Sequence, residues 1–217
     1  MILLIYDAPH RKTYDFIMAL TWAGYTIDCI YAAPWEQITS KPELINLSTQ
    51  GLYTPHTRLV AEALRIPYII KRHDEIDGQG ELGVIAGARI LKAHVVDTFS
   101  NIINIHPGKL PEIRGLDTVK HSILKDVQMM VTAHYIDAKI DRGRFLCEEP
   151  VNIYKSDSMK DIFNRMMSIQ PRTLLNALDS QVGHSIGLGA YCATMTPLQE
   201  THTLIRFTEY KRRWSCE

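Results

Sequence analysis

The stretch NIINIHPGKLPEIRG, residues 101–115, decides how this sequence folds and where its chemistry lies. It begins as an apolar run of the kind found in a buried strand, and it ends in a loop marked by proline and glycine. Asn104 and His106 stand where the strand gives way to the loop. Because side chains alternate between the two faces of a strand, these two polar residues point to the same side.

Strand-like runs alternate with helical patterns before this stretch. They are, in order, strand 2–7, helix 14–24, strand 25–32, helix 55–66, strands 68–73 and 82–88, helix 90–99 and strand 102–107. This β-α-β-α order predicts an α/β fold with a mostly parallel twisted sheet and helices on both faces. Asn104 and His106 then lie at the carboxyl end of a parallel strand, where open α/β sheets bind their ligands.

The second half of the chain is mixed. We expect a helix ending at 121–126, strands at 130–137 and 145–154, and a long helix at 158–182 bent near Pro171. The run 203–214 alternates partly between polar and apolar residues, which predicts a strand pair or an extended arm. We therefore expect a catalytic domain over residues 1–185 and a C-terminal tail over 186–217 that is not an independent domain.

The composition limits the class of protein. The chain has 217 residues, is 46% hydrophobic and carries no net formal charge. This suffices for one well-packed domain and argues against a protein whose main task is to bind nucleic acid. Four cysteines without clustered spacing fit reduced thiols. Neither a signal-like segment nor a membrane-spanning run is apparent. We expect a soluble cytoplasmic protein with no membrane partner.

An amide beside an imidazole can stabilise a developing oxyanion. Asn104 offers a fixed N–H group and His106 offers charge and a proton, while a nearby carboxylate would orient the imidazole. Asp141 is the best candidate, because Gly143 lets its loop turn tightly. A single histidine at a strand end is nevertheless more often a hydrogen-bonded structural residue than a catalyst.

Two alternatives belong to other classes of protein. A metal-dependent hydrolase could use His106, His121, His134 and Asp141, although no H-x-H or H-E-x-x-H spacing places them on one surface. A catalytically silent folate- or nucleotide-binding module is the second alternative. It would not need a general base, so an intact set of Asn104, His106 and Asp141 speaks against it.

Three successive segments resemble the signatures of the folate-dependent formyltransferases. They are GVIAGARIL (83–91), the N-x-H-P…L-P…R-G run of 101–115 and VTAHYIDAKIDRGRFL (131–146). The family includes glycinamide ribonucleotide, methionyl-tRNA and nucleotide-sugar N-formyltransferases. The resemblance implies a Rossmann-like domain that transfers a formyl group from N10-formyltetrahydrofolate to an amine without a metal. It also implies that Asn104, His106 and Asp141 form the catalytic trio.

The same resemblance places the folate against two backbone segments. The residues that match them are Ala88, Arg89, Ile90, Leu91, Ala138, Lys139, Ile140 and Gly143. A pterin needs backbone donors and acceptors between flat apolar walls, so side-chain identity matters little there. For Ile90 and Leu91, helix packing is an equally good explanation. His134 matches a recurrent family position beside the site.

The sequence departs from its relatives in ways that bear on the acceptor. The first strand is followed by YDAPHRKTYD (6–15), without the glycine-rich phosphate loop of a glycinamide ribonucleotide enzyme. The neutral chain also ends soon after the long helix, whereas a methionyl-tRNA enzyme needs a further barrel domain. We expect an amino-sugar acceptor, a nucleotide-linked 4-amino-4,6-dideoxyhexose of a surface-glycan or pseudaminic-acid-type pathway. Another small amine, such as glycinamide ribonucleotide, is the alternative.

Several residues are candidates for contacts to that acceptor. They are His10, Arg11, Lys12, Arg114, Lys120, Trp35 and His134. For the basic residues, a solvated surface position is an equally good explanation, and Trp35 could form part of a stacking wall with Tyr53 and His56. We also expect a homodimer formed through the C-terminal tail.

Overall fold

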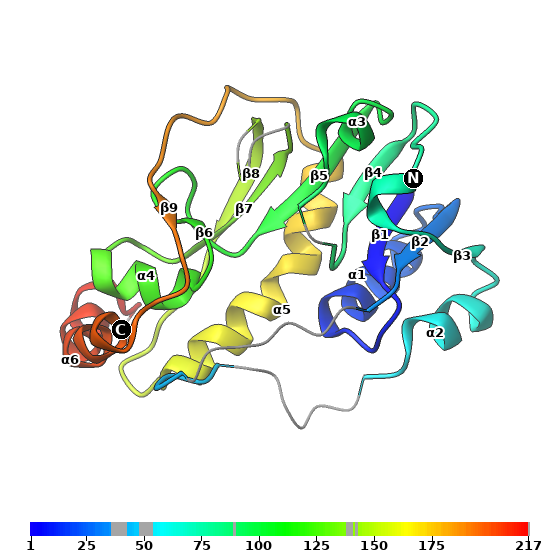
Figure 1. Cartoon of the computed structure of the whole chain (residues 1–217). Helices are drawn as coiled ribbons and strands as arrows, with labels where there is room; N and C mark the ends of the chain where they lie inside the picture. The colour runs from blue at the N-terminus through cyan, green and yellow to red at the C-terminus, as the bar shows by residue number, and fades with distance from the viewer. Residues whose placement is uncertain (36–42, 48–53, 89, 138–140, 142, 217) are drawn as a thin grey trace.

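The computed structural model describes residues 1–35, 43–47, 54–88, 90–137, 141 and 143–216. Its centre is a seven-stranded sheet in the order β3-β2-β1-β4-β5-β7-β8 (Figure 1). The strands of this sheet are β1 (Ile2–Tyr6), β2 (Cys29–Ala33), β3 (Tyr68–Ile70), β4 (Leu82–Ile85), β5 (Asn101–His106), β7 (Met130–Tyr135) and β8 (Arg144–Pro150). The five strands from β3 to β5 in this order are parallel, and β7 and β8 run antiparallel. The predicted α/β fold with a mostly parallel sheet is confirmed.

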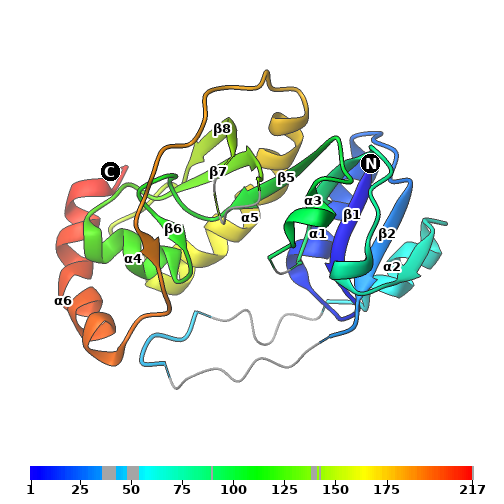
Figure 2. The ribbon, with the colours of Figure 1, turned by 45° about the horizontal axis from the view of Figure 1, so that its top comes forward.

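Six α-helices and a short 3-10 helix accompany the sheet in the described part of the chain. They are α1 (Arg11–Trp22), α2 (Thr57–Ala63), η1 (His73–Glu75), α3 (Ala93–Val96), α4 (Thr118–Lys125), α5 (Met159–Leu178) and α6 (Pro197–Trp214). A second, two-stranded sheet pairs β6 (Arg114–Gly115) with β9 (Tyr191–Cys192) in parallel. Figure 2 shows α4 and α6 side by side at the end of the molecule away from β1 and β2.

Both faces of the sheet are covered, which explains why β1 is apolar throughout. Leu3 and Ile5 belong to a large core that also contains side chains of α1 and α5. Ile2 and Leu4 belong to a smaller core on the other face, which contains Val95 of α3. Fully burying one such side chain contributes about 1.5–3 kcal/mol of hydrophobic stabilisation. A central strand with two buried faces therefore has a continuous hydrophobic run.

The C-terminal tail corrects one prediction. Residues 203–214, which we expected to form a strand pair or an extended arm, lie within α6, and only Tyr191–Cys192 is a strand. Thr196 caps the helix in a reciprocal pair of hydrogen bonds with Gln199, and proline follows the cap at position 197. Glu200, Thr203 and Tyr210 are buried at helical spacing. The partial alternation of residues 203–210 thus suggested the two-residue period of a strand, whereas the segment is helical.

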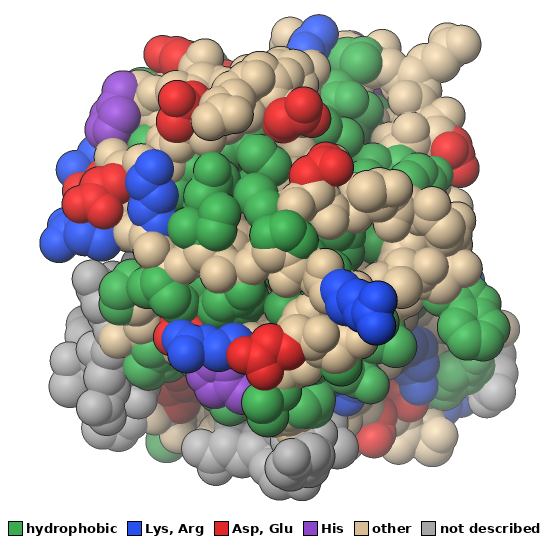
Figure 3. Space-filling view, turned by 90° about the vertical axis from the view of Figure 1, so that its right-hand side faces the viewer, with side chains coloured by type: hydrophobic (Ala, Val, Ile, Leu, Met, Phe, Trp, Pro, Cys, Tyr) green, Lys and Arg blue, Asp and Glu red, His purple; other side chains and the backbone are tan. Residues whose placement is uncertain are grey.

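The exposed edge of the sheet is β3, where Ile69 and Ile70 are 41% and 47% exposed. Figure 3 views the side of the molecule that lies to the right in Figure 1, and it shows hydrophobic side chains gathered over the centre of that side, among charged ones.

No helix in the described residues has the length and apolar character needed to cross a membrane.

Candidate active site

Asn104 and His106 share one face of β5, as the alternation predicts. Ile103 and Ile105 point into the large core, whereas Ile102 belongs to the smaller core on the opposite face. Asn104 and His106 therefore lie on the same side as Ile102, at the carboxyl end of the strand. Asn104 is half-buried, and His106 is only 3% exposed.

His106 is held at both of its ring nitrogens. Its Nε2 atom donates a hydrogen bond to the carbonyl oxygen of Ile113 at 2.7 Å. Its Nδ1 atom lies 3.4 Å from Oδ1 of Asp141. Both neighbours are oxygens that only accept hydrogen bonds, so the charged imidazolium can donate to both at once. The structure brings His106 and Asp141 together as the sequence predicts.

Asp141 is presented by a tightly turned loop. Asp141 itself has φ +46°, and Gly143 has φ +103°, a value that favours glycine. The backbone N–H of Gly115 donates to Oδ2 of Asp141 at 2.9 Å. Burial raises the pKa of Asp141, but the hydrogen bond and charge of His106 and this N–H outweigh burial. The net pKa lies below its ordinary value, so the carboxylate stays ionised at neutral pH.

His134 orients the amide of Asn104. The two residues pair across β5 and β7, and Nδ2 of Asn104 donates to Nε2 of His134 at 3.2 Å. Nδ1 of His134 faces the carbonyl oxygen of Tyr135 at 3.3 Å, which is consistent with a neutral ring protonated at Nδ1. This leaves the second N–H of the Asn104 amide free of His134.

Two further groups of the site are backbone atoms that sequence reasoning missed. They are the carbonyl of Ile113, which holds His106, and the N–H of Gly115, which holds Asp141. Gly115 lies in β6, which pairs with Tyr191–Cys192 of the tail. The tail therefore supports the loop that fixes Asp141. The L-P…R-G pattern of the loop is the one sequence feature that could have indicated these backbone contacts.

The predicted folate residues are described only in part. Arg89, Ala138, Lys139 and Ile140 lie outside the described residues. Leu91 is 6% exposed and packs in the smaller core beside the partly buried Ala88, which agrees with the packing explanation for Leu91.

Ile90 is 68% exposed and lines a cavity of about 360 Å³. Tyr6, Arg72, His73 and Lys92 also line this cavity, which puts aromatic and cationic side chains beside the segment predicted to bind folate.

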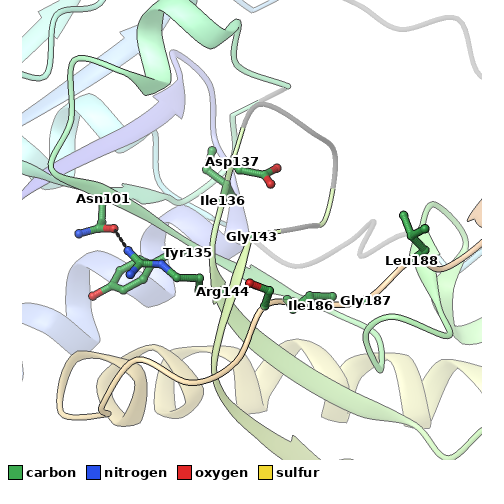
Figure 4. Close-up of a pocket in the computed structure, with 10 residues that line it drawn as sticks. Asn101, Tyr135, Ile136, Asp137, Gly143, Arg144, Ile186, Gly187 and Leu188 are labelled. Carbon is green, nitrogen blue, oxygen red and sulfur yellow. Dashed lines mark hydrogen bonds between the residues drawn. The ribbon is translucent and has the colours of Figure 1, made fainter.

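A second cavity, of about 400 Å³, flanks the aspartate loop. Figure 4 shows its lining residues coming from the end of β7, the start of β8 and the segment after α5. Gly143 and Ile186 are neighbours in its wall, since the N–H of Ile186 donates to the carbonyl oxygen of Gly143 at 2.9 Å, and Leu188 also lines the cavity. Arg144 donates to Oδ1 of Asn101 at 2.8 Å at its edge.

A third cavity, of about 410 Å³, begins directly after His106. Pro107, Gly115 and Phe163 contribute to its wall, and Glu43 and Asp117 give it acidic groups. This third cavity adjoins both His106, through Pro107, and Asp141, through the hydrogen bond from Gly115.

The three basic residues predicted near the first strand do not form one cluster. The Nδ1 atom of His10 accepts a hydrogen bond from the N–H of Thr13 and thereby caps α1. Arg11 pairs with Asp15 at 2.6 Å. Lys12 alone reaches the carboxyl end of β5, where its Nζ donates to the carbonyl oxygen of Ile105 at 2.8 Å.

Lys120 is an internal ion-pair residue and no longer a candidate for an anion contact. Its ammonium is 2.6 Å from Glu200, 3.0 Å from Glu43 and 3.7 Å from Asp117, and Lys120 is 2% exposed. Because three carboxylates already surround this ammonium, it is poorly suited to bind a substrate anion. It instead links α4 to α6.

Arg114 and Trp35 were also predicted to contact the acceptor. Arg114 donates to the carbonyl of Gly189 at 3.0 Å and so contributes to holding the tail. Trp35 is 55% exposed and packs edge-on against Tyr6, whose ring lines the cavity beside Ile90. His56 caps α2, while Tyr53 lies outside the described residues. The stacking wall stays a prediction for Trp35.

The described residues contain no group of three or more His, Cys, Asp or Glu side chains arranged to hold a metal ion.

Comparison with known proteins places this geometry in a family. The family model described as formyl transferase matches residues 69–178, about half of the chain, and this stretch contains all three residues of the trio. The chain belongs to the formyl transferase family. The family is folate-dependent, as the resemblance implied.

Curated relatives of this family match over shorter stretches. A methionyl-tRNA formyltransferase from Elusimicrobium minutum is 32% identical over 87 residues, which is 39% of this chain and 26% of the relative. A phosphoribosylglycinamide formyltransferase from Bacillus subtilis is 28% identical over 83 residues, which is 38% of this chain and 43% of the relative. The matched stretch therefore spans less than half the length of either formyltransferase.

Solved formyltransferase structures resemble the whole fold. A sugar N-formyltransferase from a Shewanella species has a TM-score of 0.57 and 20% identity, covering 94% of this chain and 86% of its own. A phosphoribosylglycinamide formyltransferase from Anaplasma phagocytophilum has a TM-score of 0.59 and 18% identity, covering 89% of this chain and 98% of its own. At these identities the likeness establishes the fold.

Proposed function

We propose that this chain is an N-formyltransferase that moves a formyl group from N10-formyltetrahydrofolate to an amine. The observation that carries the proposal is the arrangement of Asn104, His106 and Asp141 at the carboxyl end of β5. Family membership supports it, because the matched region contains the whole trio.

The trio suits the tetrahedral intermediate of formyl transfer. When an amine adds to the formyl carbon, negative charge develops on the formyl oxygen, and the second N–H of the Asn104 amide can donate to it. The imidazolium of His106 supplies positive charge nearby, and the ionised Asp141 stabilises that charge. A proton transfer by His106 through Nε2 requires that its hydrogen bond to Ile113 be exchanged for one to the substrate.

The acceptor we propose is an amino sugar, specifically a nucleotide-linked 4-amino-4,6-dideoxyhexose of a carbohydrate biosynthesis pathway in the cytoplasm. The start of α1 supports this choice over glycinamide ribonucleotide. The ring of His10 accepts a hydrogen bond from the N–H of Thr13, and Arg11 forms an ion pair with Asp15. A ribonucleotide phosphate at this helix N-terminus would compete with both contacts.

Solved structures that resemble the chain include enzymes for this class of acceptor. They include the sugar N-formyltransferase from a Shewanella species and a 4-N formyltransferase from Francisella tularensis. Glycinamide ribonucleotide is the second candidate, because phosphoribosylglycinamide formyltransferases also occur among the curated relatives and the solved structures.

A panel of acceptors tests the proposal. The full chain is incubated with N10-formyltetrahydrofolate and, in separate reactions, dTDP- and UDP-linked 4-amino-4,6-dideoxyhexoses, glycinamide ribonucleotide and methionyl-tRNA. Release of tetrahydrofolate and a product heavier by one formyl group are measured together. We expect turnover with an amino sugar. Turnover with glycinamide ribonucleotide alone would keep the reaction and change the acceptor, and no turnover with any amine would contradict the proposed function.

A further inference from the structure

A lysine that the trio does not include reaches the same strand end. Lys12 stands in the first turn of α1, and its Nζ atom donates to the carbonyl oxygen of Ile105 at 2.8 Å. Ile105 lies between Asn104 and His106 in the chain. Strand β4 pairs with β5 only as far as Asn104, so it leaves the carbonyl of Ile105 open to another donor. Lys12 thus brings an ammonium group to the active-site end of β5.

This ammonium has spare capacity to bind an anion. An ammonium has three N–H donors, and Ile105 uses one of them. Within the part of the chain that the structure describes, no carboxylate lies within 4.0 Å of Lys12, whereas Arg11, His106 and Lys120 each have a carboxylate partner. A partly buried cation without a carboxylate in contact is costly, and a negative group of the bound reactants would offset that cost.

The groups that face Lys12 come from α1 with its cap and from the loop that carries Asp141. His10 caps the start of α1, the Asp141 carboxylate attracts Lys12 from the loop between β7 and β8, and the ring of Phe16 lies 5.2 Å from its ammonium. Burial lowers the pKa of Lys12 to about 8, and the attraction of Asp141 offsets only part of this effect. Burial and the charge of Lys12 in turn lower the pKa of His10.

We propose that Lys12 is a further catalytic residue, whose ammonium binds the formyl oxygen as it becomes an oxyanion. This inference rests on the proposed formyl transfer. The amine nitrogen forms a bond to the formyl carbon, and the carbonyl π electrons move to oxygen, which then lies against the N–H groups of Asn104 and Lys12. The amine loses a proton, the electron pair on oxygen re-forms the carbonyl as the bond from carbon to N10 breaks, and N10 takes the electron pair of that bond and a proton. Lys12 stays protonated throughout.

The charge and the hydrogen bond of Lys12 can be separated by substitution. Lys12→Gln keeps a donor that can reach the Ile105 carbonyl but removes the charge, and Lys12→Arg keeps the charge. Lys155→Met is the control, because Lys155 is exposed on the turn before α5 and forms no contact with the trio. Binding of 5-formyltetrahydrofolate, an unreactive isomer of the donor, reports separately on the folate site.

The test is the pH profile of kcat/KM for the acceptor that the panel identifies. The wild-type profile should fall on the alkaline side with an apparent pKa near 8, as the ammonium is lost. Lys12→Gln should be about 10²–10³-fold slower at pH 7, as for the loss of one oxyanion donor, and should lack this alkaline limb. Lys12→Arg should keep at least about a tenth of the activity and move the limb above about pH 9. Lys155→Met should match the wild type.

The remaining outcomes distinguish an error in the role of Lys12 from an error in the proposed function. Near wild-type turnover by Lys12→Gln, or an alkaline limb near pH 8 that survives in both Lys12 variants, would overturn the role of Lys12. A wild-type profile without the alkaline limb would also overturn the role of Lys12. This measurement does not depend on whether any variant folds. Wild-type protein that is inactive with every amine would instead contradict the proposed function.

Discussion

The Nδ1 atom of His106 lies 3.4 Å from Oδ1 of Asp141, although one residue ends β5 and the other stands in the loop between β7 and β8. The same carboxylate accepts from the N–H of Gly115. One largely buried carboxylate therefore contacts the end of β5 and the β6 segment from the loop between β7 and β8.

Replacing this carboxylate should cost stability in a pH-dependent way. Because the folded-state pKa of Asp141 is lowered, its ionised form stabilises the fold above the unfolded pKa of about 4, and this contribution is lost as pH falls through the folded pKa. We expect Asp141→Asn to lower the free energy of unfolding by about 1–3 kcal/mol at pH 7, and by less at pH 3.5. Urea unfolding at both values measures this.

Asp97→Asn is the matched control for this measurement, because Asp97 is exposed and forms no ion pair among the described residues. It should change the free energy of unfolding by less than about 0.5 kcal/mol at either pH. An Asp141→Asn penalty that is equal at pH 7 and pH 3.5 would show that the carboxylate charge does not contribute.

A methyl group at position 143 should displace the aspartate loop. Gly143 has φ +103°, and a Cβ atom there would lie 2.0 Å from the carbonyl oxygen of Tyr135. We expect Gly143→Ala to lower stability by about 2–4 kcal/mol and to abolish most activity, since backbone strain and a steric clash act together.

Gly24→Ala separates strain from clash. Gly24 has φ +82°, but nothing lies within 4 Å of a Cβ atom built there. This variant should lose about 1 kcal/mol and keep wild-type activity. Thermal unfolding and formyl transfer are measured for both variants, and equal activity in the two would show that the Asp141 loop tolerates the clash.

The charged form of Lys12 should lower the stability of the folded protein. Its pKa falls from 10.5 in the unfolded chain to about 8 in the fold, so its ionised form opposes folding below pH 8. We expect Lys12→Met to raise the free energy of unfolding at pH 7 by up to about 3 kcal/mol, from about 1.36 kcal/mol for each pKa unit. This gain should shrink as pH rises from 8 toward 10.5.

Guanidinium chloride unfolding at pH 7 and pH 10 measures this difference, with Lys155→Met as the control. A less stable Lys12→Met protein at pH 7 would mean that the Ile105 hydrogen bond and the packing of the lysine stem contribute more than burial of the ammonium costs.

The C-terminal tail offers a surface for a second copy of the chain. On α6, Leu198, Leu204 and Ile205 are 66%, 51% and 72% exposed. We predict a homodimer with α6 at or near its interface, and Ile205→Glu should then give a monomer without loss of helix. Light scattering at tens of micromolar tests this, and a wild-type monomer would end the dimer prediction.

Local patterns predicted the parts of the fold and site that depend on near neighbours. The alternation of 101–106 is a property of a single strand, so the shared face of Asn104 and His106 followed from it. Gly143 marked the turn that carries Asp141. The prediction of a strand pair for 203–214 was wrong because residues 203–210 fit the strand period and the helix period equally in part. The packing of this segment against α4, which decides between them, is a tertiary contact.

Other features of the site depend on long-range backbone geometry. The Ile113 carbonyl and the Gly115 N–H have no side-chain signature, and only the fold brings them to His106 and Asp141. The sequence likewise grouped Lys12 with His10 and Arg11. Only the packing of α1 against the sheet separates the residue that reaches β5 from the two that cap and flank the helix.

The most direct test of the catalytic account is formyl transfer from N10-[¹³C]formyltetrahydrofolate, measured by product mass in wild type, His106→Ala and Asp141→Asn. We expect ¹³C-formylated product from the wild type and a rate about 10²–10⁴-fold lower in each variant. Binding of 5-formyltetrahydrofolate should change less than about threefold. Near wild-type transfer by either variant, with the folate still bound, would contradict the assignment of the trio.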